Sequence, residues 1–369
     1  MGLLDRYRQF QELSPEEVSA GLREEAEERR RKALATVGEL DLSRTTWHEY
    51  PPSVVVDAIT YAARRGLHRY AAGAGELRSA IAHRHGVTPE RVVLGDGSSQ
   101  LLVSAAQALL GPGDELLAPW PSYPLYPVMA REAGAETATV TGHDADSILE
   151  GVTKKTRLVA IANPNDPTGE LLGAAELERL LDALPERVGV ILDEALRDFV
   201  TAEEADAALR LTERHPRLIV FRSFSKAWGL AGLRCGYAVC GPGAEALVAG
   251  FGPPLGIGEL SQAGVLEALE AIPGVVAERA QAVATERERL YGALSALPVE
   301  AFPDSQANFI WLAATGMDGA GLAAALARFS VKVATGAALG DSRHVRVAVQ
   351  DEPASARFLR ALDQALGRA

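Results

Sequence analysis

Short runs of consecutive apolar residues alternate along the chain with stretches whose apolar residues recur at helical spacing. The runs occupy residues 91–95, 115–119, 156–161, 188–193 and 218–223. A strand that is apolar at every position is buried on both faces, as in a parallel sheet covered by helices. The pattern therefore predicts an α/β fold with a mostly parallel central sheet sandwiched by helices. Ligands of such sheets bind at the carboxyl ends of the strands.

The N-terminal segment predicts a helical arm. Residues 14–36 begin with Ser14, Pro15 and Glu17, which suit a helix start, and continue as a charged stretch of mixed sign. Mixed charge argues against a nucleic-acid-binding helix, so we expect the arm to pack on its own or a partner subunit. We assign residues 1–39 to this arm.

A long helical pattern over residues 258–296 carries the chain out of the predicted sheet. Two further strands, at 308–313 and 344–350, then alternate with helices, which is typical of a small α+β unit. We therefore expect a large domain over residues 40–270 and a smaller C-terminal domain over residues 271–369.

Composition limits the classes of function. Apolar residues make up 47% and charged residues 23%, and the net charge of −12 disfavours nucleic acids and anionic membranes as partners. Cys235 and Cys240 give no disulfide framework, and the histidines show no metal-binding spacing. Because the chain also has a charged start and no long apolar run, we expect a cytoplasmic protein without a metal.

Residues 221–237, FRSFSKAWGLAGLRCGY, combine an amine with groups that bind anions. Ser223, Ser225 and Arg234 can hold a phosphate through charge-assisted hydrogen bonds. Lys226, once desolvated, can lose its proton and attack a carbonyl. The combination indicates pyridoxal phosphate, whereas the motif taken alone also fits a solvated turn.

Other predicted strand ends carry polar groups. The segment GDGSSQLL places Ser98 and Ser99 at a helix start, which favours an anion, although its first half is also similar to a dinucleotide-binding turn. Tyr123 can stack on a flat ring or simply pack. Asp193 ends a strand and can pair with a pyridinium nitrogen or cap a helix.

Further candidates lie in loops and in the predicted small domain. Asn165 and Asp166 belong to a rigid loop that either presents them to a ligand or is only a turn. Trp47 lies in an irregular segment that lines a pocket or anchors a loop, and Tyr70 offers a hydroxyl to an anion. Arg346 stands within a strand, where a cation is costly unless it meets an anion.

Six motifs stand in the order and spacing of one family: GDGSSQLL, PSYPLY, NPNDPTG, LDEALRDF, SFSKAWGLAGLRCGY and HVRVAVQ. The chain thus resembles the fold type I pyridoxal phosphate enzymes of the class I/II aminotransferases over about residues 45–366. LHRYAAGAGELRSAIA and SQANFIWL make it most similar to the histidinol-phosphate aminotransferase and threonine-phosphate decarboxylase branch.

The resemblance implies a role for each candidate. Lys226 would form the Schiff base and move protons, Asp193 would pair with the ring nitrogen, and Tyr123 would stack on the ring. The phosphate would be held by Ser98, Ser99, Ser223, Ser225 and Arg234, and by Tyr70 from the other subunit of a homodimer. The amino acid and 2-oxo acid would be bound by Arg346, Asn308 and Trp47.

The sequence departs from the family pattern beside the cofactor's ring oxygen. Asp166 and Leu196 replace an Asn and a Tyr that donate to that oxygen, so we expect an unusually high pKa for the Schiff base. Asn165 would supply the contact if the loop shifts. Ala334 stands where histidinol-phosphate enzymes tend to have an Arg, so we do not expect histidinol phosphate as substrate.

The sequence favours an aminotransferase that exchanges amino groups between an amino acid and a 2-oxo acid. A pyridoxal phosphate-dependent decarboxylase, lyase or oxidase would share every cofactor residue. A cofactor-binding module without turnover fits less well, because regulators of this fold normally add a basic DNA-binding domain and the stretch before the fold is one helix of mixed charge. A dinucleotide oxidoreductase also fits less well, because it would leave Lys226 and Asp193 as coincidences.

Overall fold

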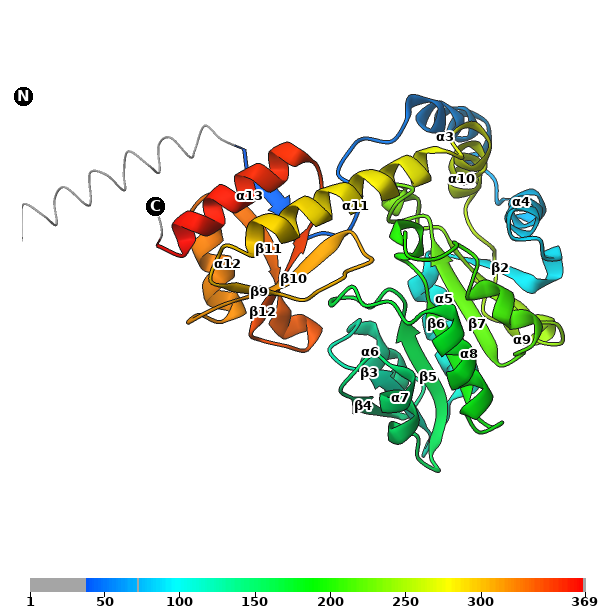
Figure 1. The fold of residues 1–369 in the computed structure, drawn as a ribbon. Coiled ribbons are helices and arrows are strands. Elements are labelled where there is room, and N and C mark those ends of the chain that lie inside the picture. The colour runs from blue at the N-terminus through cyan, green and yellow to red at the C-terminus, as the bar shows by residue number, and fades with distance from the viewer. Residues whose placement is uncertain (1–37, 72, 368–369) are drawn as a thin grey trace, which may run out of the picture.

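The computed structural model describes residues 38–71 and 73–367, in which strands and helices build two sheets (Figure 1). The arm predicted over residues 1–39 lies almost entirely outside the described residues.

A seven-stranded sheet forms the larger body, in the order β2-β8-β7-β6-β5-β3-β4. Its strands are β2 (Val92–Gly95), β3 (Glu115–Pro119), β4 (Glu136–Val140), β5 (Thr156–Ala162), β6 (Gly189–Asp193), β7 (Leu218–Ser223) and β8 (Gly236–Cys240). Only β8 pairs antiparallel, with β2 and with β7. The other pairs are parallel, which confirms the mostly parallel sheet.

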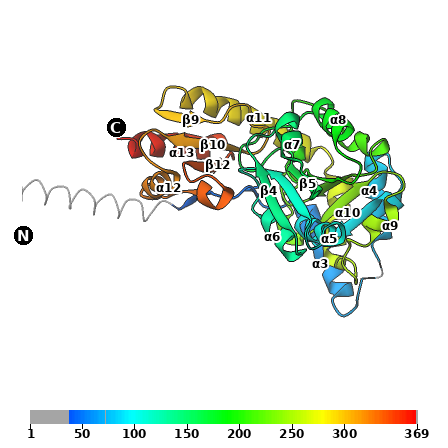
Figure 2. The same ribbon diagram turned by 90° about the horizontal axis from the view of Figure 1, so that it is seen from below.

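Helices cover both faces of this sheet (Figure 2). They are α3 (Ser53–Gly66), α4 (Gly75–His85), α5 (Ser98–Leu109), α6 (Leu125–Glu132), α7 (Ala145–Gly151), α8 (Ala174–Ala183), α9 (Glu245–Ala249) and α10 (Glu259–Ala271). In β5, Leu158 and Ala160 belong to the core under α5 and α6, whereas Val159 and Ile161 belong to the core under α7 and α8. Burial on both faces explains the unbroken apolar runs.

A five-stranded sheet forms the smaller body, in the order β1-β11-β12-β10-β9. Its elements are β1 (Leu40–Leu42), β9 (Val299–Ala301), β10 (Phe309–Ala314), β11 (Val331–Thr335), β12 (His344–Ala348), α12 (Gly319–Ala327) and α13 (Glu352–Ala365). Residues 40–42 were expected in the large domain, but β1 pairs with β11. Its three residues, LDL, are too few to show which sheet they join.

The helical pattern expected over residues 258–296 consists of two helices, α10 and α11 (Val275–Leu294), which meet at 78°. Pro273 and Gly274 stand between them, and a proline interrupts helical hydrogen bonding. Figure 1 shows α11 leading from α10 to the small sheet. Among the described residues no single helix suffices to cross a membrane; α10 and α11 meet that requirement only as a bent pair, by length and composition.

Candidate active site

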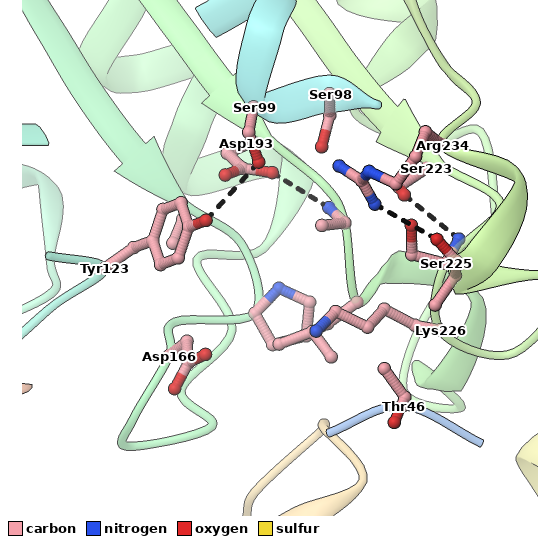
Figure 3. Close-up of a pocket in the computed structure, with 15 residues that line it drawn as sticks. Thr46, Ser98, Ser99, Tyr123, Asp166, Asp193, Ser223, Ser225, Lys226 and Arg234 are labelled. Carbon is pink, nitrogen blue, oxygen red and sulfur yellow. Dashed lines mark hydrogen bonds between the residues drawn. The ribbon is translucent and has the colours of Figure 1, made fainter. Parts of the chain in front are cut away.

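A cavity of about 250 Å³ lies at the carboxyl ends of the parallel strands (Figure 3). Predicted side chains that line it include Ser99, Tyr123, Asp166, Asp193 and Lys226. These residues come from segments far apart in sequence, and parallel strands bring their ends to one edge of a sheet. The topology therefore explains why one cavity collects them.

One end of the cavity gathers groups that donate to anions, Ser98, Ser223, Ser225 and Arg234, here called the phosphate cluster (Figure 3). Ser98 begins α5, whose first backbone amides have no partner within the helix. The Ser225 amide donates to Ser223 Oγ at 3.0 Å, which ties β7 to the loop that follows it. A helix start, two hydroxyls and a guanidinium together suit a phosphate.

Gly97 lets the guanidinium approach the start of α5. Its φ is 82°, in the region that favours glycine, and a Cβ there would lie 2.4 Å from Arg234 Nη2. Any other residue at position 97 would therefore be strained and would push Arg234 away.

Lys226 lines the cavity and is partly buried, and its Nζ donates to Thr45 Oγ1. Burial lowers the pKa of this amine, and the positive charge of Arg346 lowers it further, while Asp166 acts in the opposite direction. A larger fraction of the amine is therefore neutral at a given pH than for an exposed lysine, as a nucleophile or base requires.

Asp193 and Tyr123 lie beside the same space. Asp193 ends β6 and accepts from the Ala195 amide at 3.1 Å; burial raises its pKa to about 6, although Ala195 and Lys226 oppose the rise. The Tyr123 hydroxyl lies 3.4 Å from Ser99 Oγ, and burial raises its pKa. A buried carboxylate of this kind favours a cationic partner, such as a protonated ring nitrogen.

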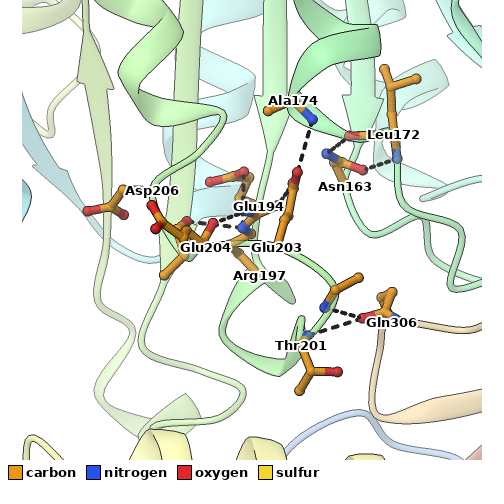
Figure 4. A network of polar contacts seen from close by, with 12 residues as sticks. Asn163, Leu172, Ala174, Glu194, Arg197, Thr201, Glu203, Glu204, Asp206 and Gln306 are labelled. Carbon is orange, nitrogen blue, oxygen red and sulfur yellow. Dashed lines mark hydrogen bonds and ion pairs between the residues drawn. The ribbon is translucent and has the colours of Figure 1, made fainter.

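A buried ionic network supports the Asp193 end of the sheet. Glu194 forms ion pairs with Arg222 (2.8 Å) and Arg197 (3.7 Å), and Arg197 also pairs with Glu203 at 2.7 Å. Figure 4 shows Glu194, Arg197 and Glu203 of this network. Asp206 adds a second ion pair to Arg222 at 2.7 Å. The pairs fix the turn that follows Asp193 and hence its carboxylate.

Three predicted residues do not line the cavity. The Asn165 side chain is buried against the segment that follows β3, where it accepts from Ser122 Oγ at 2.8 Å and donates to the Pro121 carbonyl at 3.0 Å. Arg346 forms an ion pair with Asp166, and Asn308 donates to the Thr45 carbonyl at 3.0 Å. The alternative contact proposed for Asn165 would require these loop bonds to break.

Two other predicted residues also lie off the cavity. The ring of Trp47 packs 4.5 Å from the Arg279 guanidinium, and its Nε1 donates to Glu49 at 2.9 Å. Tyr70 is 85% exposed and lines a separate groove between α3 and α10.

Sequence reasoning missed Thr45 and Thr46. Thr45 accepts from Lys226, and Thr46 lines the cavity. In the irregular stretch between residues 40 and 52 the sequence indicates Trp47 as the pocket residue, whereas the structure places Thr45 against Lys226 and Thr46 at the cavity, and nothing in the local pattern distinguishes these two threonines. Among the described residues, no group of three or more His, Cys, Asp or Glu is placed to hold a metal.

Comparison with known proteins identifies the family. Residues 36–362 match Aminotransferase class I and II. This chain belongs to the class I and II aminotransferases. The resemblance inferred from the six motifs is therefore confirmed, and the chain is a pyridoxal phosphate-dependent aminotransferase.

Several relatives of this chain are named aromatic amino acid aminotransferases. The chain is 38% identical over 292 residues to the aromatic amino acid aminotransferase of Corynebacterium efficiens, covering 77% of this chain and 82% of that protein. It is 37% identical over 326 residues to that of Corynebacterium jeikeium, covering 85% and 86%.

Solved structures share the fold of the aminotransferase. Histidinol-phosphate aminotransferase from Sinorhizobium meliloti, in complex with pyridoxal-5'-phosphate, superposes with a TM-score of 0.80 at 24% identity, covering 92% of this chain and 94% of that one. A Thermus thermophilus aspartate aminotransferase mutant gives 0.80 at 25% identity, covering 97% and 98%.

Removing the charge of the phosphate cluster tests its role in this aminotransferase. Arg234→Gln is expected to weaken pyridoxal phosphate binding about ten- to a hundredfold, because a charge-assisted hydrogen bond is lost. Equilibrium dialysis followed by cofactor absorbance measures the dissociation constant. Arg234→Lys, which keeps the charge, should lose less; equal losses in both variants, or no loss in either, would contradict this role.

Proposed function

We propose that this aminotransferase moves the amino group of an aromatic amino acid to a 2-oxo acid. Relatives 36–39% identical to it are named aromatic amino acid aminotransferases, which supports this substrate class. Apolar side chains on the cavity wall, among them Leu196, Pro164 and Ala231, suit a substrate with an apolar side group.

The position of Lys226 in the cavity, with a lowered pKa, is the observation that supports the proposed chemistry. Bound pyridoxal phosphate supplies an aldehyde and an electron-withdrawing ring. With the cofactor bound, Lys226 Nζ, whose pKa is lowered by burial, would take the proton from the substrate's Cα. Asp193 would hold positive charge at the ring nitrogen, Tyr123 would pack on the ring, and the phosphate cluster would hold the phosphate; all of these residues line the cavity.

A panel of amino acids tests the proposed substrate. The holoenzyme is mixed with each of them singly, and the spectrum of the amino form of the cofactor is recorded together with the products by mass spectrometry. We expect phenylalanine, tyrosine and tryptophan to convert fastest, each to its 2-oxo acid. Faster conversion of aspartate would refute the substrate class, and carbon dioxide or peroxide without the amino form would show a decarboxylase or an oxidase.

We propose further that the enzyme is a homodimer in which Tyr70 reaches the partner's phosphate. Tyr70 and Tyr61, which is 63% exposed, lie on the same groove between α3 and α10, where two large exposed rings suit a subunit contact. Light scattering on the eluting peak of a gel-filtration column measures the mass. A single-chain mass at working concentration would refute the dimer.

A cytoplasmic location and a two-domain division are part of the same proposal. Cys235 and Cys240 are free and buried, which suits a reducing compartment.

The 78° break between α10 and α11 supports a domain boundary near residue 271, with one domain built on each sheet.

A further inference from the structure

Asp166 belongs to a loop that is fixed on both sides. The Asn163 side chain donates to the Leu172 carbonyl at 2.9 Å and accepts from the Leu172 amide at 2.8 Å (Figure 4). Asn165, the residue before Asp166, is held by its buried bond to Ser122. Because these contacts fix the backbone, the loop presents the Asp166 carboxylate at a set position.

The Asp166 carboxylate lies between the cavity and Arg346. Asp166 lines the cavity, whereas Arg346 does not. Arg346 Nη1 donates to Asp166 Oδ1, and its Nη2 makes a long 3.3 Å bond to the Ser43 carbonyl. The two side chains are only 12% and 14% exposed, so solvent screens this ion pair weakly.

The carboxylate of an amino acid or 2-oxo acid needs a cation near the reacting end. The positive charges of Arg346 and Arg234 both lower the pKa of Lys226, which places both cations near the amine. Arg234 belongs to the phosphate cluster, so Arg346 is left for the substrate. Its guanidinium, however, already has an anionic partner. An incoming carboxylate must share or displace Asp166, and like charges in contact are unfavourable.

We propose that Asp166 is a specificity-determining residue that competes with the substrate's carboxylate for Arg346. The inference rests on the proposed transfer between amino and 2-oxo acids. The ion pair makes this part of the site electrically neutral, so the site holds acids more weakly than it would with an amide at position 166. Ligands with an uncharged end group gain nothing from such a change.

Two unreactive probes of matched shape test the competition. 3-Phenylpropionate and 3-phenylpropanamide lack an amino or oxo group, so each is titrated calorimetrically into the holoenzyme without turnover. Asp166→Asn keeps the side chain's shape and removes its charge. We expect this variant to bind the carboxylate about tenfold more tightly than the native enzyme, with the amide unchanged within about twofold.

Three further variants secure the interpretation. Asp146→Asn makes the same change at an exposed ion pair with Arg179 and should alter neither affinity. Arg346→Gln added to Asp166→Asn should abolish the gain for the carboxylate. If Asp166→Asn does not fold, Asp166→Ser takes its place with the same expectation.

Unchanged carboxylate affinity in the position-166 variant, or an equal gain for both probes, overturns the inference. This failure is distinct from failure of the proposed function. If the enzyme converts aromatic amino acids but its affinity for the carboxylate probe does not depend on residue 166, only the proposed competition is refuted. If Asp166→Asn raises the affinity for the carboxylate probe but the enzyme converts none of the aromatic amino acids, only the substrate assignment is refuted.

Discussion

Replacing Lys226 by alanine is expected to slow amino transfer by about a hundred- to ten-thousandfold, because the substrate's Cα loses its proton acceptor. The structure gives the amine the required environment: Lys226 is a partly buried residue of the cavity wall, desolvation lowers the pKa of its amine, and its Nζ donates to Thr45 Oγ1. Single-turnover absorbance with phenylalanine measures the rate.

A chemical readout separates loss of the amine from general damage. Borohydride treatment of the native holoenzyme should leave a cofactor adduct at residue 226, seen by peptide mass spectrometry, and the alanine variant should carry none. Lys155→Ala, which removes an exposed lysine paired with Glu136, should keep both the adduct and the rate. Native-like turnover by Lys226→Ala would refute the assignment.

Asp193→Asn is expected to change activity and stability in opposite directions. With an amide at position 193, the ring nitrogen loses its anionic partner, so we expect amino transfer to slow about a hundredfold. The cofactor-free protein should become more stable near neutral pH, because a buried carboxylate that resists ionisation is no longer present.

The pH dependence of that gain follows from the raised pKa. Asp193 has an ordinary value of 3.8 and a value of about 6 in the fold. Between these values the unfolded chain releases a proton that the native chain retains, so native stability falls as pH rises. Above pH 6 the loss is complete, and Asp193→Asn should then be more stable by about 1–3 kcal/mol.

Urea unfolding of the cofactor-free protein at pH 4 and pH 7.5 measures this effect. The free energies of unfolding of the native protein and of Asp193→Asn should differ little at pH 4 and clearly at pH 7.5. Asp146→Asn, at an exposed position, should show no such dependence on pH. A variant that is less stable than the native protein at pH 7.5 would contradict the prediction.

The apolar runs predicted β3, β5, β6 and β7 and the edge strand β2 of the large sheet, but not β4 or the buried β8. β5 and β6 are buried on both faces, and their unbroken apolar runs reveal them. β4 lies at the sheet edge with partly exposed residues, so ETATV shows no run. The break between α10 and α11 had a signal in Pro273 and Gly274, which the long helical pattern obscured.

Some parts of the candidate site could be predicted from the sequence and others could not. Residues at strand ends, such as Asp193 and those that follow β7, could be predicted to meet because topology brings parallel strand ends together. The contact between Asp166 and Arg346 joins loops and strands of two sheets, 180 positions apart. No local pattern encodes such a contact, so the sequence placed both residues near the ligand without showing that they meet each other.

The side-chain clamp between Asn163 and Leu172 separates the scaffold from the chemistry displayed on it. Because contacts of other residues secure the backbone on either side of residue 166, the path of the loop does not depend on the side chain at that position, although Arg346 depends on it for an ion-pair partner. A substitution at residue 166 can therefore change which ligands the site prefers without changing the course of the loop.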